Sequence, residues 1–454
     1  MTDYSASINP QDIPGDKIIV QERSVRPVSA TERIKTIDVV RGFALLGILL
    51  MNIPGFGIHW SELVKVIRGP HAGKDYYTMA IIFSFFEGTM RGLFSMLFGA
   101  GMVLFMMNKK ALPGEAPVAE YYYRRLLFLV LFGLFNAFIL LWTGDILFFY
   151  GLCGMLLFAF RKLKPVWLIL IGFACIGIGI FKTQNNYNDL RETRINYLEA
   201  VAAQNAGKEL TEEQQTAKNA WPGIERNQTV DTANVNHHLR KMHSGYITIF
   251  TYFIPDNVGG EVNYMYHGLW DMLSMMFIGM GLFVIGFFSN KLKTSTYAML
   301  LIVGYGVGIP LGWAYFNAQV DANTNITTFV DTWRSPGWQL YDFRRVLLCL
   351  GHASLLMLVF RSRIVPWLMK SLAAVGQMAF TNYLMQSIIC TLFFNGYGFD
   401  NYNKLRFHEL YYVVFSVWIL QMIYSPIWLR YFRFGPFEWL WRSLTYWKKQ
   451  PMKI

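Results

Sequence analysis

The stretch TIDVVRGFALLGILLMNIP, residues 36–54, decides the fold class. It is apolar over nearly the length that a helix needs to cross a bilayer, which is about 20 residues. Its only charges, on Asp38 and Arg41, lie near its start. We therefore expect a transmembrane helix here.

Apolar runs of the same kind recur along the chain, separated mostly by short basic connectors. They cover residues 76–108, 122–143, 144–161, 165–182, 266–289, 295–317, 344–361, 367–394 and 409–431. The second run, 76–108, is too long for one plain span, and its middle holds two charges and two glycines, a pattern typical of a kinked or broken helix. The prediction is an all-α integral membrane protein, a bundle of about ten transmembrane helices with a broken second span.

Composition and charge agree with this class. Charged residues make up 15% of the 454 residues, against roughly 25% in soluble domains. The net charge of +12 comes from Lys and Arg at the ends of apolar runs. The positive-inside rule explains that distribution better than a nucleic-acid partner does. It predicts a multi-pass protein with both termini in the cytoplasm, with membrane lipids as its partners.

The charge and hydropathy pattern divides the chain into five segments. We expect a flexible cytoplasmic tail, an N-terminal transmembrane half, an extracytoplasmic connector containing a helical hairpin or cap, a C-terminal transmembrane half, and an interfacial helix with a basic tail. These are residues 1–33, 34–182, 183–265, 266–433 and 434–454. The four cysteines lie inside separate apolar runs, so neither a disulfide framework nor a metal site is predicted.

Ionisable residues within spans are the strongest functional pointers, because charge at bilayer depth is costly. Asp38 and Arg41, three residues apart, are either a structural ion pair at the interface or a contact for a cytoplasmic ligand. Glu87 and Arg91, four residues apart near the expected break, either neutralise each other or line a substrate site.

Further polar side chains lie at the outer ends of the predicted spans. Asp145, in a tight turn, is either a helix N-cap or a group that orients a catalytic His or binds substrate. His59 and His71 lie in the first outer loop, where an imidazole is well placed for general-base work. The tract 376–387, with Asn382 and Gln386, is polar enough either to hold helices together or to line a passage.

Several motifs resemble one known family. The run 37–53, the segment 94–101 (FSMLFGAG), the segment 142–147 (WTGDIL), the tract 376–387 and the tail 434–442 (FGPFEWLWR) resemble the YeiB-type bacterial membrane proteins, with their C-terminal domain of unknown function. The resemblance covers most of residues 34–446 in the same order. The N-terminal half is also similar to transmembrane acyltransferases of the heparan-α-glucosaminide N-acetyltransferase type.

That resemblance implies an enzyme of the bacterial cytoplasmic (inner) membrane that moves an acyl group from cytosolic acyl-CoA to an extracytoplasmic glycan or lipid acceptor. In such enzymes the catalytic His lies in the first outer loop; here the loop offers His59 and His71, although its spacing to the next span departs from the acetyltransferase pattern. Asp145 would hold the tautomer of that His. No metal is predicted. The residues expected to line a cavity or bind the acyl donor are Asp38, Arg41, Asn52, Glu87, Arg91, Arg124, Arg125, Asn136, Asn382 and Gln386.

Two other readings stay open. A transporter or exporter of a small polar or lipidic molecule would use the polar groups as a path, and a non-catalytic scaffold would merely pair its buried charges with one another. The sequence is also compatible with a homo-oligomer.

Overall fold

The computed structural model describes residues 34–107, 116–226, 230–332 and 339–454, and within these ranges the regular elements are helices, with one isolated bridge between Phe432 and Lys453. The α-helices are α1 (Lys35–Gly57), α2 (Trp60–Arg68), α3 (Gly73–Phe85), α4 (Thr89–Met106), α5 (Val118–Leu134), α6 (Leu147–Leu157), α7 (Pro165–Asn205), α8 (Glu212–Arg226), α9 (Thr232–Met242), α10 (Tyr246–Val284), α11 (Thr294–Thr324), α12 (Ile326–Thr332), α13 (Tyr341–Ser362), α14 (Pro366–Gln377), α15 (Ala379–Phe394), α16 (Leu410–Tyr431) and α17 (Pro436–Tyr446). A π-helical turn (Phe135–Ile139) and 3₁₀ turns (Phe158–Phe160 and Phe407–Glu409) complete the set. The predicted all-α membrane class is confirmed.

Seven helical segments in the described residues are long and apolar enough to cross a membrane. Three shorter apolar segments, 147–160, 268–284 and 379–394, coincide with three further predicted spans. The total of ten spans therefore stays a prediction. The outward faces of the helices carry bare apolar side chains, such as Leu131 and Ile302, which are 57% and 71% exposed; such surfaces suit a lipid environment.

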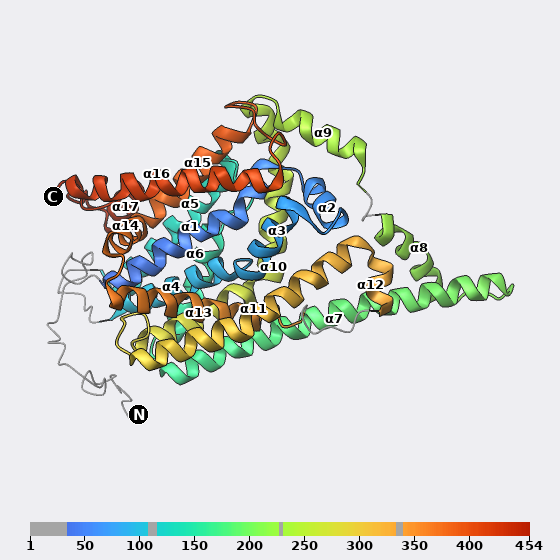
Figure 1. The fold of residues 1–454 in the computed structure, drawn as a ribbon, viewed down its shortest axis with the longest axis horizontal. Coiled ribbons are helices and arrows are strands. Elements are labelled where there is room, and N and C mark those ends of the chain that lie inside the picture. Colours follow the sequence, from blue (N-terminus) through green and yellow to red (C-terminus); the bar gives the residue numbers. More distant parts are fainter. Residues whose placement is uncertain (1–33, 108–115, 227–229, 333–338) are drawn as a thin grey trace.

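Two helices are much longer than a bilayer requires. Helix α7 has 41 residues and α10 has 39, about 60 Å each at 1.5 Å per residue, against a hydrocarbon core of about 30 Å. Figure 1 shows α7 running far past the bundle, with α8 and α12 against its outlying part. A small separate core around Trp221 and Phe329 joins these helices. The expected helical connector is thus a continuation of a membrane helix with α8 folded back on it.

Two predicted spans are interrupted. The second, as predicted, breaks into α3 and α4 at residues 86–88, where Gly88 has a φ of 67°, a left-handed conformation that glycine adopts without steric cost. The run 367–394 was predicted as one span, but it is two helices, α14 and α15, that meet at Met378.

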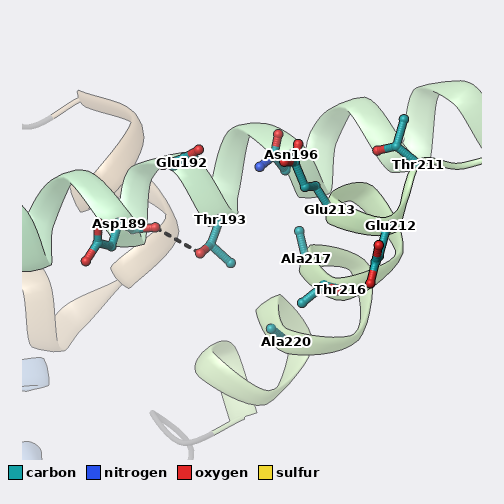
Figure 2. Close-up of a pocket in the computed structure, with 10 residues that line it drawn as sticks. All are labelled: Asp189, Glu192, Thr193, Asn196, Thr211, Glu212, Glu213, Thr216, Ala217 and Ala220. Atoms are coloured by element: carbon teal, nitrogen blue, oxygen red, sulfur yellow. Dashed lines mark hydrogen bonds between the residues drawn. The ribbon is translucent and has the colours of Figure 1, made fainter.

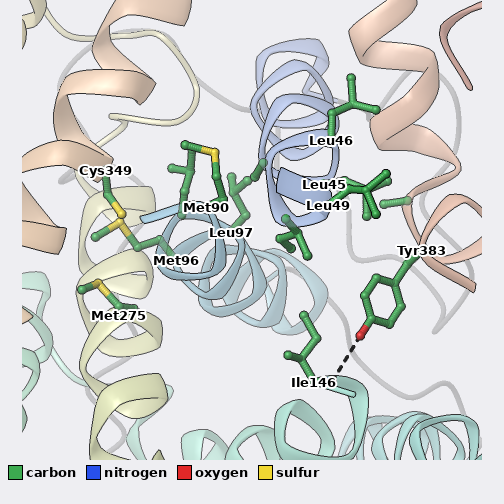
Figure 3. Close-up of a cluster of buried hydrophobic side chains, with 14 of the residues drawn as sticks. Leu45, Leu46, Leu49, Met90, Met96, Leu97, Ile146, Met275, Cys349 and Tyr383 are labelled. Atoms are coloured by element: carbon green, nitrogen blue, oxygen red, sulfur yellow. Dashed lines mark hydrogen bonds between the residues drawn. The ribbon is translucent and has the colours of Figure 1, made fainter. Parts of the chain in front are cut away.

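Helix α1 packs between the two interrupted spans. Gly42 lies directly against the backbone of Leu372 and Gly376 in α14, where a side chain would overlap the α14 main chain. On the other side, Gly47 lies against the side chain of Met90 of α4, which belongs to the buried core that Figure 3 shows. Small residues allow this close approach, as is usual for helices packed within membranes.

The basic connectors gather at one end of the bundle. Arg361 donates to the carbonyls of Asn290 and Leu292, and Gln377 donates to the carbonyl of Arg433. We call this the basic end. The opposite end, where α1 terminates at Gly57 and most of the histidines lie, is the histidine end. That the basic end faces the cytoplasm stays a prediction of the positive-inside rule.

Candidate functional site

The break between α3 and α4 is held by Arg344 of α13. The guanidinium is fully buried and donates to the carbonyls of Phe83 (3.3 Å) and Glu87 (3.1 Å), and to the Glu87 carboxylate (2.7 Å). A helix that stops leaves its last carbonyls without intrahelical donors, and its C-terminus carries partial negative charge. Arg344 meets both needs, so it acts as the cap of α3.

Glu87 and Arg91 each form an ion pair with a residue of another helix. They do not form the Glu87–Arg91 pair that their spacing suggested. Arg91 Nη2 lies 2.5 Å from Asp271 of α10. Arg345 also contacts Asp271, and lies 3.4 Å from Asp342. The cluster balances three carboxylates against three guanidiniums, because a charge at this depth is stable only when it is paired.

This ionic cluster lies toward the histidine end. Helix α4 has 18 residues, which places Gly88 about 27 Å from the basic end of that helix at 1.5 Å per residue. Arg344 is only three residues from Tyr341, where α13 begins. The break therefore lies nearer the histidine end of the bundle than the basic end, and its depth in a membrane stays a prediction.

His59 is buried at the histidine end and begins α2 as its N-cap. Its Nδ1 accepts a hydrogen bond from the Ser61 amide (3.2 Å), and its backbone amide donates to Asn403 Oδ1 (3.1 Å). Burial lowers the pKa of His59 and favours the neutral ring. An Nδ1 that accepts leaves the ring proton on Nε2, so His59 presents a donor there.

His238 of α9 lies next to it, with the two ring centroids 4.8 Å apart. The hydroxyls of Tyr252 (3.0 Å) and Tyr402 (2.9 Å) contact its two ring nitrogens. Burial, together with the neighbouring imidazoles, lowers the pKa of His238 to about 4. Because both nitrogens are engaged, this ring ties α9 and α10 to the loop before α16.

His71 is exposed beyond the end of α2. Its Nε2 donates to the carbonyl of Ile67 (3.0 Å), and its ring stacks on Tyr76 with centroids 4.9 Å apart. That leaves the lone pair on Nδ1. The two predicted loop histidines therefore differ: His59 offers a buried donor and His71 an exposed acceptor.

A further histidine, His408, forms an imidazole–carboxylate pair with Asp75 in the first turn of α3. Asp75 Oδ1 lies 2.7 Å from Nδ1 of His408 and also accepts its backbone amide at 2.9 Å. A cavity of about 300 Å³ adjoins the pair. Its wall is formed by α2, the start of α3 and the segment before α16, and consists of Glu62, Lys65, Val66, Gly69, Pro70, Ala72, Asp75, Tyr76, Leu405, Arg406 and Phe407.

A larger hollow, of about 750 Å³, lies between α7 and α8, outside the bundle. Figure 2 shows its acidic lining, with Asp189 and Glu192 on α7 and Glu212 and Glu213 at the start of α8. None of the predicted site residues lies on its wall. In the described part of the chain no group of three or more His, Cys, Asp or Glu is arranged to hold a metal ion.

Asp145 is fully enclosed and bonded to groups other than histidine. Its Oδ1 accepts from Asn136 Nδ2 (2.7 Å) and from the Tyr383 hydroxyl (3.4 Å), and its Oδ2 accepts from the Phe148 amide (3.0 Å) in the first turn of α6. These bonds start α6 and tie it to α15. The structure therefore brings Asp145 and Asn136 together. Neither residue takes part in the hydrogen bonds of His59 or His71.

The predicted cations do meet at the basic end. Arg41 pairs with Asp38 at 3.0 Å. Half-buried Arg125 stacks its guanidinium on Trp441 of α17, 4.1 Å from the ring centroid, and is close enough to Arg41 for the two charges to repel. Arg124 pairs with Glu120. Across the described residues, no carboxylate forms an ion pair with Arg125.

The polar tract of α15 forms a closed network. Gln386 donates to Gln421 (3.1 Å), which donates to the carbonyl of Asn382 (2.9 Å), and the Asn382 amide donates to Ser425 (3.1 Å). This arrangement favours the interpretation that the tract holds α15 and α16 together. Asn52, by contrast, is half-buried in α1, and within the described ranges its side chain makes no hydrogen bond.

Comparison with known proteins gives a consistent answer. "Uncharacterized protein YxaH" of Bacillus subtilis (strain 168) is 31% identical over 94% of this chain and 98% of its own length. The chain belongs to the YeiB family. "Uncharacterized protein YeiB" of Escherichia coli (strain K12) is 29% identical over 91% of this chain and 96% of its own. The family described as "Protein of unknown function (DUF418)" matches residues 282–448, and no solved structure matches.

Two parts of this YeiB-family site escaped prediction. Arg344 and Arg345 stand at the outer end of a predicted span, where the positive-inside rule disfavours cations, and that exception was a readable signal. Asp271 within the span 266–289 was another. The Asp75–His408 pair had no such signal, because 333 residues separate its members.

Proposed function

We propose that this YeiB-family chain is a transmembrane acyltransferase that takes an acyl group from acyl-CoA at the basic end and delivers it to an acceptor at the histidine end. On this proposal the basic end is cytoplasmic and the protein resides in the bacterial cytoplasmic membrane. The first support for this proposal is the resemblance of the N-terminal half to known acyltransferases. The second is the set of contacts that Arg125 makes.

Arg125 supports the proposal because it is a half-buried cation with no carboxylate partner in the described residues. A charge left unpaired in an apolar bundle is costly. Its cationic neighbour Arg41 already pairs with Asp38, so Arg125 is the guanidinium that still needs an anion. The aromatic face of Trp441 leaves the edge of the Arg125 guanidinium available for one. Phosphate groups suit such guanidiniums well, since they accept two parallel hydrogen bonds. The phosphates of acyl-CoA would supply that anion.

At the histidine end the reaction needs a base and a hydrogen-bond donor. The base, a histidine imidazole, takes the proton of the acceptor hydroxyl or amine. The acceptor atom forms a bond to the thioester carbonyl carbon, and the C–S bond breaks. The proton then passes from the imidazole to the CoA thiolate. His59, with its proton on Nε2, fits the donor that stabilises the oxyanion, and Asp145 keeps α6 in place.

The test is thiol release from acyl-CoA by the protein in lipid nanodiscs, with membrane glycans and lipids supplied as acceptors. Arg125→Gln should raise the KM for acyl-CoA at least tenfold, and Arg125→Lys should restore part of the loss. The matched control is Lys291→Gln, an exposed cation at the same end. Equal KM values for Arg125→Gln and wild type would contradict the donor site.

A second candidate is a transporter of a small polar solute, and the broken helix favours it. Interrupted helices with charged groups at the break commonly build transport sites, and the cluster around Arg344 has that form. Counterflow in proteoliposomes without acyl-CoA would support transport. The absence of both thiol release and counterflow would favour a non-catalytic scaffold.

A further inference from the structure

The Asp75–His408 pair joins two distant parts of the chain at the histidine end. Asp75 stands in the first turn of α3, and His408 in the 3₁₀ turn that leads into α16. One carboxylate oxygen receives both the backbone amide and Nδ1 of His408, at 2.9 and 2.7 Å. Two bonds to a single oxygen fix the plane of the imidazole as well as its position.

The geometry determines which nitrogen of His408 is basic. A carboxylate accepts and does not donate, so the neutral ring carries its proton on Nδ1 and its lone pair on Nε2. No hydrogen bond to this Nε2 occurs among the residues that the structure describes. The carboxylate would also stabilise the imidazolium that forms when Nε2 takes a proton.

The other histidines of this end are less suited to be a base. His59 carries its proton on Nε2, and both nitrogens of His238 contact tyrosine hydroxyls. His71 keeps a lone pair on Nδ1 but has a carbonyl as its partner. His243 does pair with a carboxylate, Asp400, but that carboxylate is shared with a lysine.

The adjoining cavity indicates the class of acceptor. Its wall carries Asp75 itself and the two residues before His408. Glu62 and Lys65, which pair at 2.7 Å, offer charge on another side, and Tyr76 adds an aromatic ring. Charged groups beside an aromatic face suit a sugar, whose hydroxyls take hydrogen bonds while its C–H face packs on the ring.

We propose that His408 is the general base of the reaction, that Asp75 is its positioning residue, and that the cavity holds a sugar-type acceptor. This proposal rests on the proposed acyltransferase function. The acceptor hydroxyl gives its proton to Nε2 of His408, and its oxygen bonds to the acyl carbon as the C–S bond breaks. The imidazolium then protonates the CoA thiolate, while Asp75 stays ionised throughout.

The experiment compares wild type, His408→Gln, Asp75→Asn and the control His243→Gln, which removes the imidazole of the other carboxylate pair. In nanodiscs with acetyl-CoA and a mixture of monosaccharides, His408→Gln should lower kcat/KM about 10²–10⁴-fold, with His243→Gln within threefold of wild type. Asp75→Asn should lower kcat at least tenfold, and Asp75→Glu, which restores a carboxylate acceptor for Nδ1, should recover part of that loss. Nitrogen NMR signals of the histidine rings, assigned with His408→Gln, should show the proton of His408 on Nδ1 in wild type without turnover.

The outcomes separate the two proposals. No thiol release by wild type with any acyl-CoA and any acceptor, sugar or lipid, would overturn both. Release that depends on a lipid acceptor and not on a sugar would overturn the sugar assignment alone. Release by wild type that His408→Gln retains within threefold would overturn the base assignment and leave the acyltransferase function standing. An equal loss in His408→Gln and His243→Gln would also overturn it, as would a neutral His408 ring that carries its proton on Nε2 in wild type.

Discussion

Glu438 of α17 accepts a hydrogen bond from the hydroxyl of Thr381 at 2.5 Å, and its other oxygen accepts the backbone amides of Phe380 and Thr381 at 2.7 and 3.0 Å. These amides belong to the first turn of α15, so a carboxylate from α17 caps the start of a half-helix. Arg344 does the converse at the end of α3. Each break in the bundle is thus met by a charge of the sign that the helix dipole favours.

Glu438→Ala should destabilise the protein by about 1–2 kcal/mol, the usual cost of a lost N-cap. The substitution leaves two amides at the start of α15 without an acceptor, whereas Glu438→Gln keeps one acceptor oxygen and should cost less. The midpoint of thermal unfolding in detergent measures both. An unchanged midpoint in Glu438→Ala would show that α15 starts without this cap.

Arg344→Met should cost about 3–5 kcal/mol, because it leaves the Glu87 carboxylate without its cationic partner and with only the Tyr341 hydroxyl as a hydrogen-bond donor. The double variant Arg344→Met with Glu87→Met removes the stranded charge and should recover part of that loss. Urea or heat unfolding of the two variants supplies the comparison. A double variant no more stable than Arg344→Met alone would contradict a direct ion pair.

Gly42→Ala should destabilise the contact of α1 with α14, since a methyl group there overlaps the carbonyl of Leu372. Overpacking of this kind costs about 1–3 kcal/mol. Gly101→Ala in α4 is the matched control, because nothing lies within 4 Å of a methyl group at that position, and removing a helical glycine there should be neutral or slightly stabilising. Equal unfolding midpoints for the two variants would refute the close approach.

The protein should lose stability as the pH falls from about 6.5 toward 4. The pKa of His238 is lowered from 6.5 to about 4 in the folded chain, so within this window the unfolded chain binds the proton and the folded chain does not. The contribution is complete above pH 6.5 and shrinks as the solution is acidified. His238→Gln should flatten the dependence of the unfolding midpoint on pH, whereas His237→Gln, an exposed neighbour, should leave most of it.

Local features of the chain were sufficient to predict the class of fold and one of its irregularities. In a bilayer, a long apolar run can pair its backbone N–H and C=O groups only by forming a helix. Residues 36–54 and the later apolar runs are therefore predicted as helices from their composition alone. The charges and glycines at residues 87–92 likewise predicted the break between α3 and α4. The break at Met378 was missed, because the cap of α15, Glu438, lies on another helix, 57 residues after Thr381.

Which charged and polar side chains pair with one another was decided by the tertiary structure alone. From spacing, Glu87 and Arg91 were candidates to neutralise each other, yet each found its partner on a distant helix, Arg344 or Asp271. His408 carried no local signal, and only the packing of α3 against the turn before α16 brings Asp75 to it. The sequence by itself determined which segments become helices, because backbone satisfaction in lipid is a local requirement. Packing decided which charges meet, because pairing depends on the contacts between helices that the chain order does not specify.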